Sequence, residues 1–476
     1  MILSNGVGLV NLRLSERLLS VEPCLLSATE AIELIASRQM TSIELVKSCL
    51  YRINELEATL HAWAYLNDEL PLAAAHALDQ NRQRGERVGV LEGVPLGIKD
   101  IFNTRDMKTQ MGSPIWKDFT PGNDARVVET LRHKGGIVMG KTVTAEFAVH
   151  SPGPTVNPYD PCRTPGTSSS GSAAAVATGM VPLALGTQTA GSTIRPASYC
   201  GVYGFKPSFG LVPRTGMLKT IDTLDHVSFF SRTVDDLKLI FDRTRVSGSN
   251  HPFIEERVDT STQGIHPTRW RVGLVRGPKW TDAETYAQVA LEDFAKQLQL
   301  CESVIVEELP LPPAFSEVHD IHQKIYYRML AYYFKEECRQ PEYISRSFRK
   351  IVEYGNQFTS EDYQSGLRFQ NEVKALLDRL FHDFDIILNL SSAGEAPVGL
   401  ETPDRPDHCL LWTFCHVPVL NLPVFVGPAG LPFGAQIVAR KYCDYQLLQF
   451  AKFLWDEGLI GRGPFPALPA TLSGSR

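Results

Sequence analysis

The chain has 476 residues, of which 43% are hydrophobic and 21% charged, and its formal net charge is −6. This length allows one large domain or two to three ordinary ones, and the composition is that of a globular chain rather than a disordered or fibrous one. Because the net charge is negative, we expect no broad positive face to neutralise phosphates, which argues against nucleic acid as a direct partner.

The sequence shows no sign of export or of a membrane segment. Its first residues lack the basic region and the small-residue cleavage site of a signal peptide. The longest weakly polar stretch, residues 173–186, is shorter than the roughly 20 residues that a membrane-spanning helix needs. The nine cysteines are scattered without a C-x-x-C pair, which is typical of reduced thiols rather than of disulfides or a thiolate zinc site. We therefore expect a cytoplasmic protein with no membrane partner.

Two helices are predicted near the start of the chain, each preceded by a capping box. The boxes pair Ser27 with Glu30 and Thr41 with Glu44. Between residues 93 and 250, short apolar runs alternate with helical patterns such as residues 125–135; the runs lie at 94–98, 136–140 and 181–187. This rhythm predicts strands and helices in a layered α/β domain.

The second half of the chain continues with a loop and further α/β elements. Residues 246–269 are polar and aperiodic, which predicts a loop. Beyond it, residues 270–277, a helix capped by Thr281 and Glu284, and residues 302–309 predict a strand, a helix and a strand. Residues 315–382 are helical and rich in aromatic residues, and strands are predicted at 385–390 and 433–440.

One motif suggests a nucleotide site, but its context argues against it. Gly135, Gly140, Lys141 and Thr142 satisfy the phosphate-loop pattern. That loop must follow a strand and wrap irregular backbone around phosphate. Here a helical run precedes Gly135, and residues 137–139 look like a strand. A P-loop nucleotide-binding protein is therefore only a weak alternative.

Two further patterns are interpreted as structural. His319 and His322 could share a helix face, but no third ligand accompanies them, so we do not predict a metal site. Ser347 and Lys350 match the S-x-x-K spacing of some serine acylases within a basic polar run, which favours a solvated helix face.

Three stretches combine small residues with isolated charges. They read GVPLGIKD at 93–100, TPGTSSSGSAAAVATG at 164–179 and GTQTAGSTIRPASYCG at 186–201. A single Gly/Ser-rich segment is usually a flexible loop. Two such segments joined by an apolar run, with a lysine ending an apolar strand upstream, predict a rigid backbone cradle instead.

These stretches resemble the amidase signature family, serine hydrolases with a Ser, cis-Ser, Lys triad. The resemblance includes AEF at 145–147 and GLPFGAQIVA at 430–439. It implies one amidase signature domain over residues 27–457, an α/β/α fold with a central mixed β-sheet covered by α-helices on both faces. Residues 1–26 would be an N-terminal extension, about 93–245 the catalytic core, about 313–382 a variable helical substrate region and 458–476 a tail.

The resemblance also assigns catalytic roles. Ser192 corresponds to the nucleophile, Ser168 to the cis-serine, after a cis peptide bond from Thr167, and Lys99 to the base. An apolar setting favours the neutral form of a lysine, which a base requires. Lys141 and Lys206 are the competitors for this role.

The same comparison predicts an oxyanion hole. Its backbone N–H groups would come from Thr189, Ala190, Gly191 and Ser192, where small side chains let the backbone approach a substrate.

Several positions depart from the common family pattern. Thr167 stands where Gly commonly precedes the cis-serine, and Gln188 and Ala190 stand where Asp and Gly are common. Many members read S-I-R-x-P after the nucleophile, whereas this chain reads S-T-I-R-P, which places the arginine at Arg195. Malonamidase-like members resemble this order, so we expect the chain to lie near that branch.

Arg195 is the predicted substrate-binding residue. It lies three residues after Ser192, and its planar guanidinium could hold a substrate carboxylate through two hydrogen bonds. The alternative is that Arg195 bonds backbone carbonyls and orders its own loop.

The resemblance implies hydrolysis of a small-molecule amide through a serine acyl-enzyme, which releases a carboxylic acid and ammonia or an amine. Neither a metal nor an organic cofactor is expected, and the chain is compatible with a homodimer. Two alternatives stay open: a glutaminase-type subunit of an amidotransferase complex, which would pass ammonia to a partner protein, and the P-loop nucleotide-binding protein.

Overall fold

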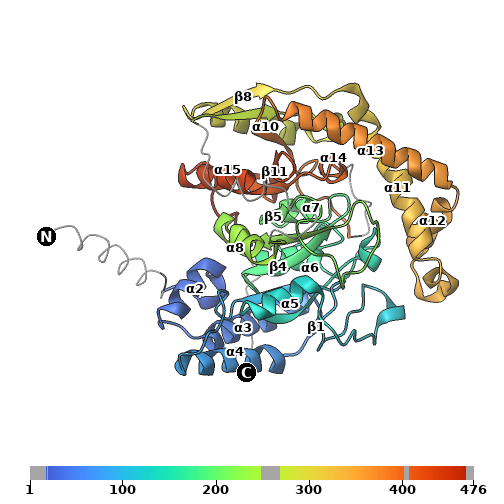
Figure 1. Ribbon diagram of the computed structural model, residues 1–476. Coiled ribbons are helices and arrows are strands. Elements are labelled where there is room, and N and C mark those ends of the chain that lie inside the picture. Colours follow the sequence, from blue (N-terminus) through green and yellow to red (C-terminus); the bar gives the residue numbers. More distant parts are fainter. Residues whose placement is uncertain (1–17, 19, 248–267, 401–406, 468–476) are drawn as a thin grey trace.

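A mixed β-sheet of eleven strands runs through the structure, a computed structural model that describes residues 18, 20–247, 268–400 and 407–467 (Figure 1). The strands lie side by side in the order β1-β3-β2-β4-β6-β5-β10-β11-β9-β7-β8. Their bounds are β1 Trp63–Leu66, β2 Pro95–Lys99, β3 Ile137–Thr142, β4 Leu183–Gln188, β5 Tyr203–Lys206, β6 His226–Ser231, β7 Trp270–Leu274, β8 Val304–Glu308, β9 Ile386–Leu390, β10 Val419–Val426 and β11 Pro432–Ala439.

The two strands that lead into the candidate site are neighbours. β2 pairs in parallel with β4, with Leu96 opposite Leu183 and Ile98 opposite Leu185. On its other side β2 pairs in parallel with β3, whereas β4 pairs with antiparallel β6. Parallel strands end at the same edge of a sheet, and in α/β proteins ligands bind outside such carboxyl ends. The end of β2 and the segment that follows β4 therefore meet at one edge.

Each strand contributes side chains to both faces of the sheet. In β3, Val138 joins the core on one face, and Ile137 and Met139 join the core on the other, as the two-residue repeat of a strand requires. The first face is covered by α5 Arg126–His133, α8 Val234–Thr244, α10 Thr285–Gln299 and α15 Asp444–Asp456. The second is covered by α3 Ser42–Leu60, α4 Glu69–Gln83, α6 Ser170–Ala177 and α7 Ile194–Tyr199, and farther along by α14 Leu410–Phe414. Helix α11 Val318–Tyr333 packs on α14 and on α13 Ser360–Leu380. The predicted α/β/α fold is confirmed.

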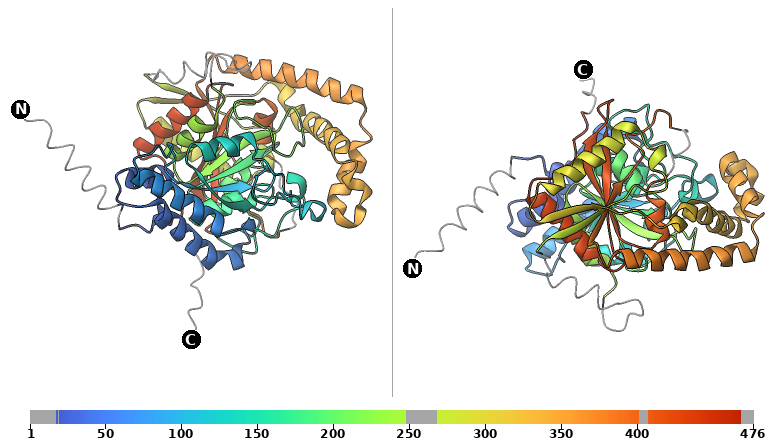
Figure 2. Two further views of the ribbon diagram at one scale, coloured as in Figure 1. Left: turned by 60° about the horizontal axis from the view of Figure 1, so that its bottom comes forward. Right: turned by 90° about the horizontal axis from the view of Figure 1, so that it is seen from above.

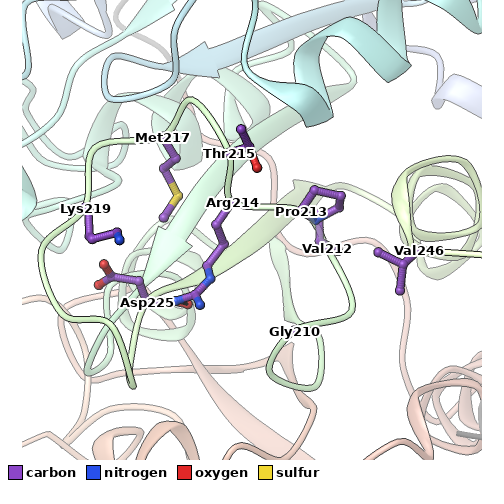
Figure 3. Close-up of a pocket in the computed structure, with 9 residues that line it drawn as sticks. All are labelled: Gly210, Val212, Pro213, Arg214, Thr215, Met217, Lys219, Asp225 and Val246. Carbon is purple, nitrogen blue, oxygen red and sulfur yellow. Dashed lines mark hydrogen bonds between the residues drawn. The ribbon is translucent and has the colours of Figure 1, made fainter. Parts of the chain in front are cut away.

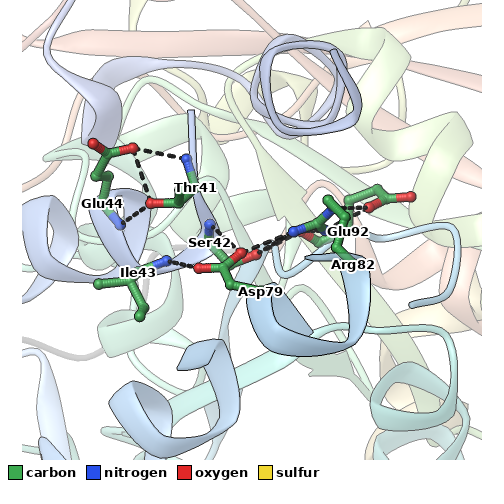
Figure 4. Close-up of polar contacts among 7 residues, drawn as sticks. All are labelled: Thr41, Ser42, Ile43, Glu44, Asp79, Arg82 and Glu92. Atoms are coloured by element: carbon green, nitrogen blue, oxygen red, sulfur yellow. Dashed lines mark hydrogen bonds and ion pairs between the residues drawn. The ribbon is translucent and has the colours of Figure 1, made fainter. Parts of the chain in front are cut away.

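The first helices start at the predicted caps. Both capping boxes form, Ser27 with Glu30 before α2 (Ala28–Ala36) and Thr41 with Glu44 before α3. At α3, Asp79 also accepts hydrogen bonds from the first two helical amides, at 3.0 Å each, and Arg82 donates to Asp79 at 2.8 Å (Figure 4). These bonds satisfy backbone N–H groups that a helix start leaves without partners.

The helical region predicted at 315–382 forms an arm. Helices α11, α12 (Arg346–Gly355) and α13 project together from one end of the sheet (Figures 1 and 2). Glu146, within the AEF segment, ties this arm to the core, since its carboxylate accepts the amide of Ser345 at 3.0 Å just before α12. Phe147 packs on Phe334 of the arm, with ring centroids 4.7 Å apart.

One predicted boundary is wrong. The helix expected from a cap at Thr281 and Glu284 begins at Thr285, and Trp280–Asp282 form a 3-10 turn. A capping box needs the Glu284 amide for the threonine hydroxyl, but this amide donates to the carbonyl of Ala393 at 2.8 Å. The loop predicted at 246–269 lies mostly outside the described residues. Within the described part of the chain, no helix has the length and hydropathy needed to cross a membrane.

Candidate active site

Lys99 is the last residue of β2, and its side chain is fully buried. Its Nζ atom lies 2.7 Å from Ser168 Oγ, 2.9 Å from Ser169 Oγ and 2.8 Å from Thr187 Oγ1. All three contacts are neutral hydroxyls. Burial therefore holds the pKa of Lys99 well below its usual value, although the carboxylate of Asp225 raises it in part. In this setting the lysine can exist as a neutral amine.

Ser168 reaches Lys99 because the chain turns sharply just before α6. Gly166 and Thr167 both adopt left-handed backbone conformations, with φ of 104° and 74°. A Cβ atom on Gly166 would lie 2.5 Å from the Cα atom of Pro196 in α7, so glycine is required there. The prediction of a cis peptide bond between Thr167 and Ser168 is wrong, since the described residues contain no cis peptide bond. Two consecutive left-handed residues make the turn instead.

Ser192 lies in the loop between β4 and α7, and 9% of its surface is exposed, against 1% for Ser168. The contact of Gly166 with Pro196 places the two serine-bearing segments side by side. Within the described residues the Ser192 hydroxyl makes no hydrogen bond. The structure thus joins Lys99 to Ser168 directly and leaves the more accessible Ser192 outside that hydrogen-bond network.

The loop 189–192 presents backbone donors. The carbonyl of Gly191 accepts the amide of Arg195 at 3.0 Å, the first helical bond of α7. In the part of the chain that the structure describes, no group accepts a hydrogen bond from the amides of Ala190, Gly191 or Ser192. Consecutive amides in this state can donate to an oxygen that develops negative charge.

Asp225 contacts this loop through Thr189. Its buried carboxylate accepts hydrogen bonds from Thr189 Oγ1 at 2.8 Å and from the amides of Thr220 and Ile221 at 2.9 Å each. Burial raises the pKa of Asp225. The same residue borders a cavity of about 390 Å³, into which Arg214 extends toward Asp225 (Figure 3). Asp225 thus contacts both this cavity and Thr189 of loop 189–192.

Arg195 forms a buried ion pair with Asp407, with 3.1 Å between Nη1 and Oδ2. The other carboxylate oxygen accepts the amides of Cys409 and Leu410 at 2.7 and 3.0 Å. Burial by itself raises the pKa of Asp407, but the Arg195 guanidinium and the Cys409 amide outweigh it, so the pKa lies below its usual range. The positive charge of Arg195 is thus balanced within the protein.

The two competing lysines have other partners. Lys141 Nζ lies 3.1 Å from Asp100 Oδ1 and 2.7 Å from Thr109 Oγ1. Lys206 donates to the carbonyl of Val417 at 2.5 Å, and burial lowers its pKa to about 7. Among the described contacts, neither lysine is bonded to a serine, so the geometry favours Lys99 as the base.

The phosphate-loop alternative is wrong. Residues 137–142 form β3, and Lys141 and Thr142 pair with β1 and β2 as ordinary strand residues. A backbone committed to two strand neighbours cannot wrap around a phosphate group. Ser347 and Lys350 are exposed on α12, as predicted.

His319 and His322 lie on α11 and both face backbone carbonyls. His319 Nε2 lies 2.9 Å from the carbonyl oxygen of Asp407, and His322 Nε2 lies 3.0 Å from that of Thr189. Each ring therefore contacts a backbone carbonyl of a segment near the site.

Sequence reasoning missed several residues of the site. Ser169 and Thr187 lie within two of the small-residue stretches, and the number of hydroxyls there was a signal that more than one would face Lys99. Asp225, Asp407 and Thr413 lie in segments without such a pattern, and only the fold brings them to loop 189–192.

Comparisons with known proteins agree with the fold. A model of the Amidase family matches residues 44–448. The putative amidase AmiD of Mycobacterium tuberculosis H37Rv is 31% identical over 446 residues, which cover 89% of this chain and 92% of that protein. One subunit of the glutamyl-tRNA(Gln) amidotransferase of Chloroflexus aggregans is 30% identical over 463 residues, which cover 89% of this chain and 94% of that protein. A crystal structure of an amidase matches with a TM-score of 0.81 and 27% identity over 92% of this chain and 100% of that one.

Fold and comparisons together define an enzyme that hydrolyses amide bonds. The chain belongs to the amidase family.

Proposed function

We propose that Ser192 attacks the carbonyl carbon of a small-molecule amide while Lys99, as a neutral amine, receives its proton through Ser168. The observation that carries this proposal is the buried Lys99 amine, 2.7 Å from the Ser168 hydroxyl. A serine hydroxyl is a poor nucleophile unless a base takes its proton. Because a hydroxyl donates and accepts hydrogen bonds at once, Ser168 is suited to pass the proton from Ser192 to Lys99.

The attack converts the substrate carbonyl oxygen into an oxyanion. The backbone amides of Thr189, Ala190, Gly191 and Ser192 would stabilise this charge. Protonated Lys99 then returns the proton through Ser168 to the substrate nitrogen. The C–N bond breaks, ammonia or an amine leaves, and the acyl group remains on Ser192 as an ester.

Water completes the cycle by the same route. It attacks the ester carbonyl while its proton passes through Ser168 to Lys99, and the proton is then returned to Ser192 Oγ as the ester bond breaks. A carboxylic acid leaves, and Lys99, Ser168 and Ser192 return to their starting protonation states.

The substrate class depends on Arg195. A substrate clamp would select amides that bear a free carboxylate, and the S-T-I-R-P order supports a place near the malonamidase-like branch. The buried pair with Asp407 supports the other role, in which Arg195 orders the segment around the nucleophile. A clamp would have to share the guanidinium between Asp407 and the substrate.

A glutaminase-type subunit is the second candidate function. The similarity to the amidotransferase protein of Chloroflexus aggregans over 89% of this chain supports it. Such a protein would pass ammonia to a partner and would show little activity alone.

We further propose that residues 27–457 form one domain, which the single sheet shared by β1 to β11 supports.

Covalent labelling tests the nucleophile. A fluorophosphonate should add its mass to one tryptic peptide that contains Ser192, and Ser192→Ala should abolish the labelling. Labelling that persists unchanged in Ser192→Ala would assign the nucleophile to another residue.

A substrate panel separates the two functions. Purified protein is incubated with acetamide, benzamide, malonamate, 4-nitroacetanilide, glutamine and urea, and released ammonia or amine is measured. Turnover of a simple amide without partner or ATP supports the amidase, whereas release of ammonia from glutamine only after addition of a partner protein supports the amidotransferase function.

A further inference from the structure

Two side chains from outside loop 189–192 form hydrogen bonds with its backbone carbonyl oxygens. His322, on α11, places Nε2 3.0 Å from the carbonyl oxygen of Thr189. Thr413, on α14, donates its hydroxyl to the carbonyl of Ala190 at 2.6 Å. Neither residue belongs to the segments that carry the nucleophile, the relay or the base.

These two contacts determine where the next amides point. In a planar trans peptide the C=O and N–H bonds point in opposite directions. A partner on the Thr189 carbonyl therefore sets the direction of the Ala190 amide, and a partner on the Ala190 carbonyl sets that of the Gly191 amide. These amides are two of the proposed oxyanion donors, whose stabilising effect depends on direction.

The donor atom of His322 is settled by its surroundings. A carbonyl oxygen only accepts, so the proton must be on Nε2. The ring is buried and stacks on Tyr326, with centroids 5.5 Å apart and planes 20° apart. Burial lowers the pKa of His322 to about 4, so the ring is neutral near pH 7 and its tautomer constant. The imidazole is thus held in one orientation against the loop.

The proton of Thr413 is directed as well. Gln188 accepts the amides of Thr193 and Ile194 on Oε1, at 2.9 and 3.0 Å, which fixes the orientation of its side-chain amide. Its Nε2 atom then donates to Thr413 Oγ1 at 2.9 Å. With this lone pair occupied, the hydroxyl proton of Thr413 is left for a carbonyl oxygen. The carbonyl of Ala190 lies 2.6 Å from Thr413 Oγ1 and that of Cys409 3.5 Å, so the bond to Ala190 is the favoured one.

We propose that His322 and Thr413 are positioning residues that aim the amides of Ala190 and Gly191 at the oxyanion. This inference rests on the proposed function, since it assumes an oxyanion formed beside Ser192. It links the helical arm to the chemistry, because α11 both belongs to that arm and carries His322. Changes in the arm that move His322 would then alter the rate of the chemical step.

Thr413→Val tests the hydroxyl at nearly constant volume, and Thr413→Ser retains it. The control is Thr244→Val in α8, where a buried hydroxyl donates to the carbonyl of Ile240 at 2.7 Å, away from the loop. Two rates are measured: inactivation by a fluorophosphonate, whose phosphoryl oxygen takes the place of the oxyanion, and turnover of the panel amide that is hydrolysed fastest.

We expect Thr413→Val to lower the inactivation rate constant and kcat by about 10- to 100-fold, less than the loss of a whole oxyanion donor. KM should stay unchanged, because the lost interaction acts in the transition state. The pH dependence of kcat should also stay unchanged, since Lys99 and its hydroxyl partners are intact. Thr413→Ser and Thr244→Val should keep wild-type rates.

His322 is tested by a parallel pair. His322→Gln keeps an N–H donor near the position of Nε2 and should retain most of kcat, whereas His322→Leu should lose about 10-fold or more. Thermal unfolding verifies that each variant is folded.

Wild-type rates in folded Thr413→Val and His322→Leu would overturn the inference, and so would equal losses in the valine and serine variants or in the leucine and glutamine variants. Failure of the proposed function is a separate result, seen in the wild-type protein as labelling or amide turnover that does not depend on Ser192.

Discussion

Replacing Ser168 with alanine is expected to lower kcat by about 10²-fold or more, because a positioned group that transfers a proton contributes roughly this much. The variant removes the hydroxyl that lies 2.7 Å from Lys99 Nζ and that would connect the base to Ser192. Lys99 itself keeps two further hydroxyl contacts and stays buried. The loss should therefore appear in the chemical step and not in the fold.

The neighbouring serine provides a matched control for this experiment. Ser169 Oγ lies 2.9 Å from Lys99 Nζ, so Ser169→Ala removes nearly the same contact. Each lost hydrogen bond should cost about 1 kcal/mol in the free energy of unfolding. If only Ser168 relays the proton, Ser169→Ala should lower kcat less than about 10-fold, well below the effect of a lost proton carrier.

The assay compares kcat, KM and thermal unfolding of the two variants with the panel amide that is hydrolysed fastest. A hydroxyl oxygen that accepts from an ammonium group stabilises the charged form, so either variant should lower the pKa of Lys99 further. The rise of kcat with pH should then move to lower pH in both. Equal losses of kcat in the two variants, or near-normal turnover in Ser168→Ala, would refute the relay assignment.

Three further outcomes are expected. Lys99→Met should abolish turnover, and the wild-type rate should rise with pH because only the unprotonated amine accepts a proton; near-normal turnover in Lys99→Met would transfer the role of base elsewhere. Arg195→Ala should reduce turnover of malonamate far more than of acetamide if Arg195 clamps a carboxylate, whereas equal losses with a lower melting temperature would assign it to loop structure. Gly191→Ala should lower kcat by about 10²-fold, because the new Cβ atom would lie 2.5 Å from Asp407 Oδ1, an atom that already accepts two backbone amides. The control is Gly461→Ala, where a Cβ atom meets nothing within 4 Å. Equal rates in the two variants would show that the loop tolerates the methyl group.

Much of the local structure could be read from the sequence. The capping boxes at Ser27 and Thr41 use residues three apart, and the alternation along β3 depends on side chains that point to opposite faces, so short-range rules predict both. The start of α10 was misplaced because Ala393, more than a hundred residues away, takes the amide of Glu284. The backbone before Ser168 also differed from expectation, since the contact of Gly166 with α7 shapes that turn.

The sequence by itself determined the family and the segments that hold Lys99, Ser168 and Ser192, because closely spaced small residues next to a lysine-ended strand are a local pattern. Only the tertiary structure decided what surrounds them. Arg195 meets a carboxylate 212 positions away, and the Ala190 carbonyl meets the hydroxyl of a residue 223 positions away. Hydrogen bonds and ion pairs act over a few ångströms, so their partners depend on which helices the sheet brings together. That choice results from packing of the whole chain around two apolar faces, and no short stretch of sequence contains it.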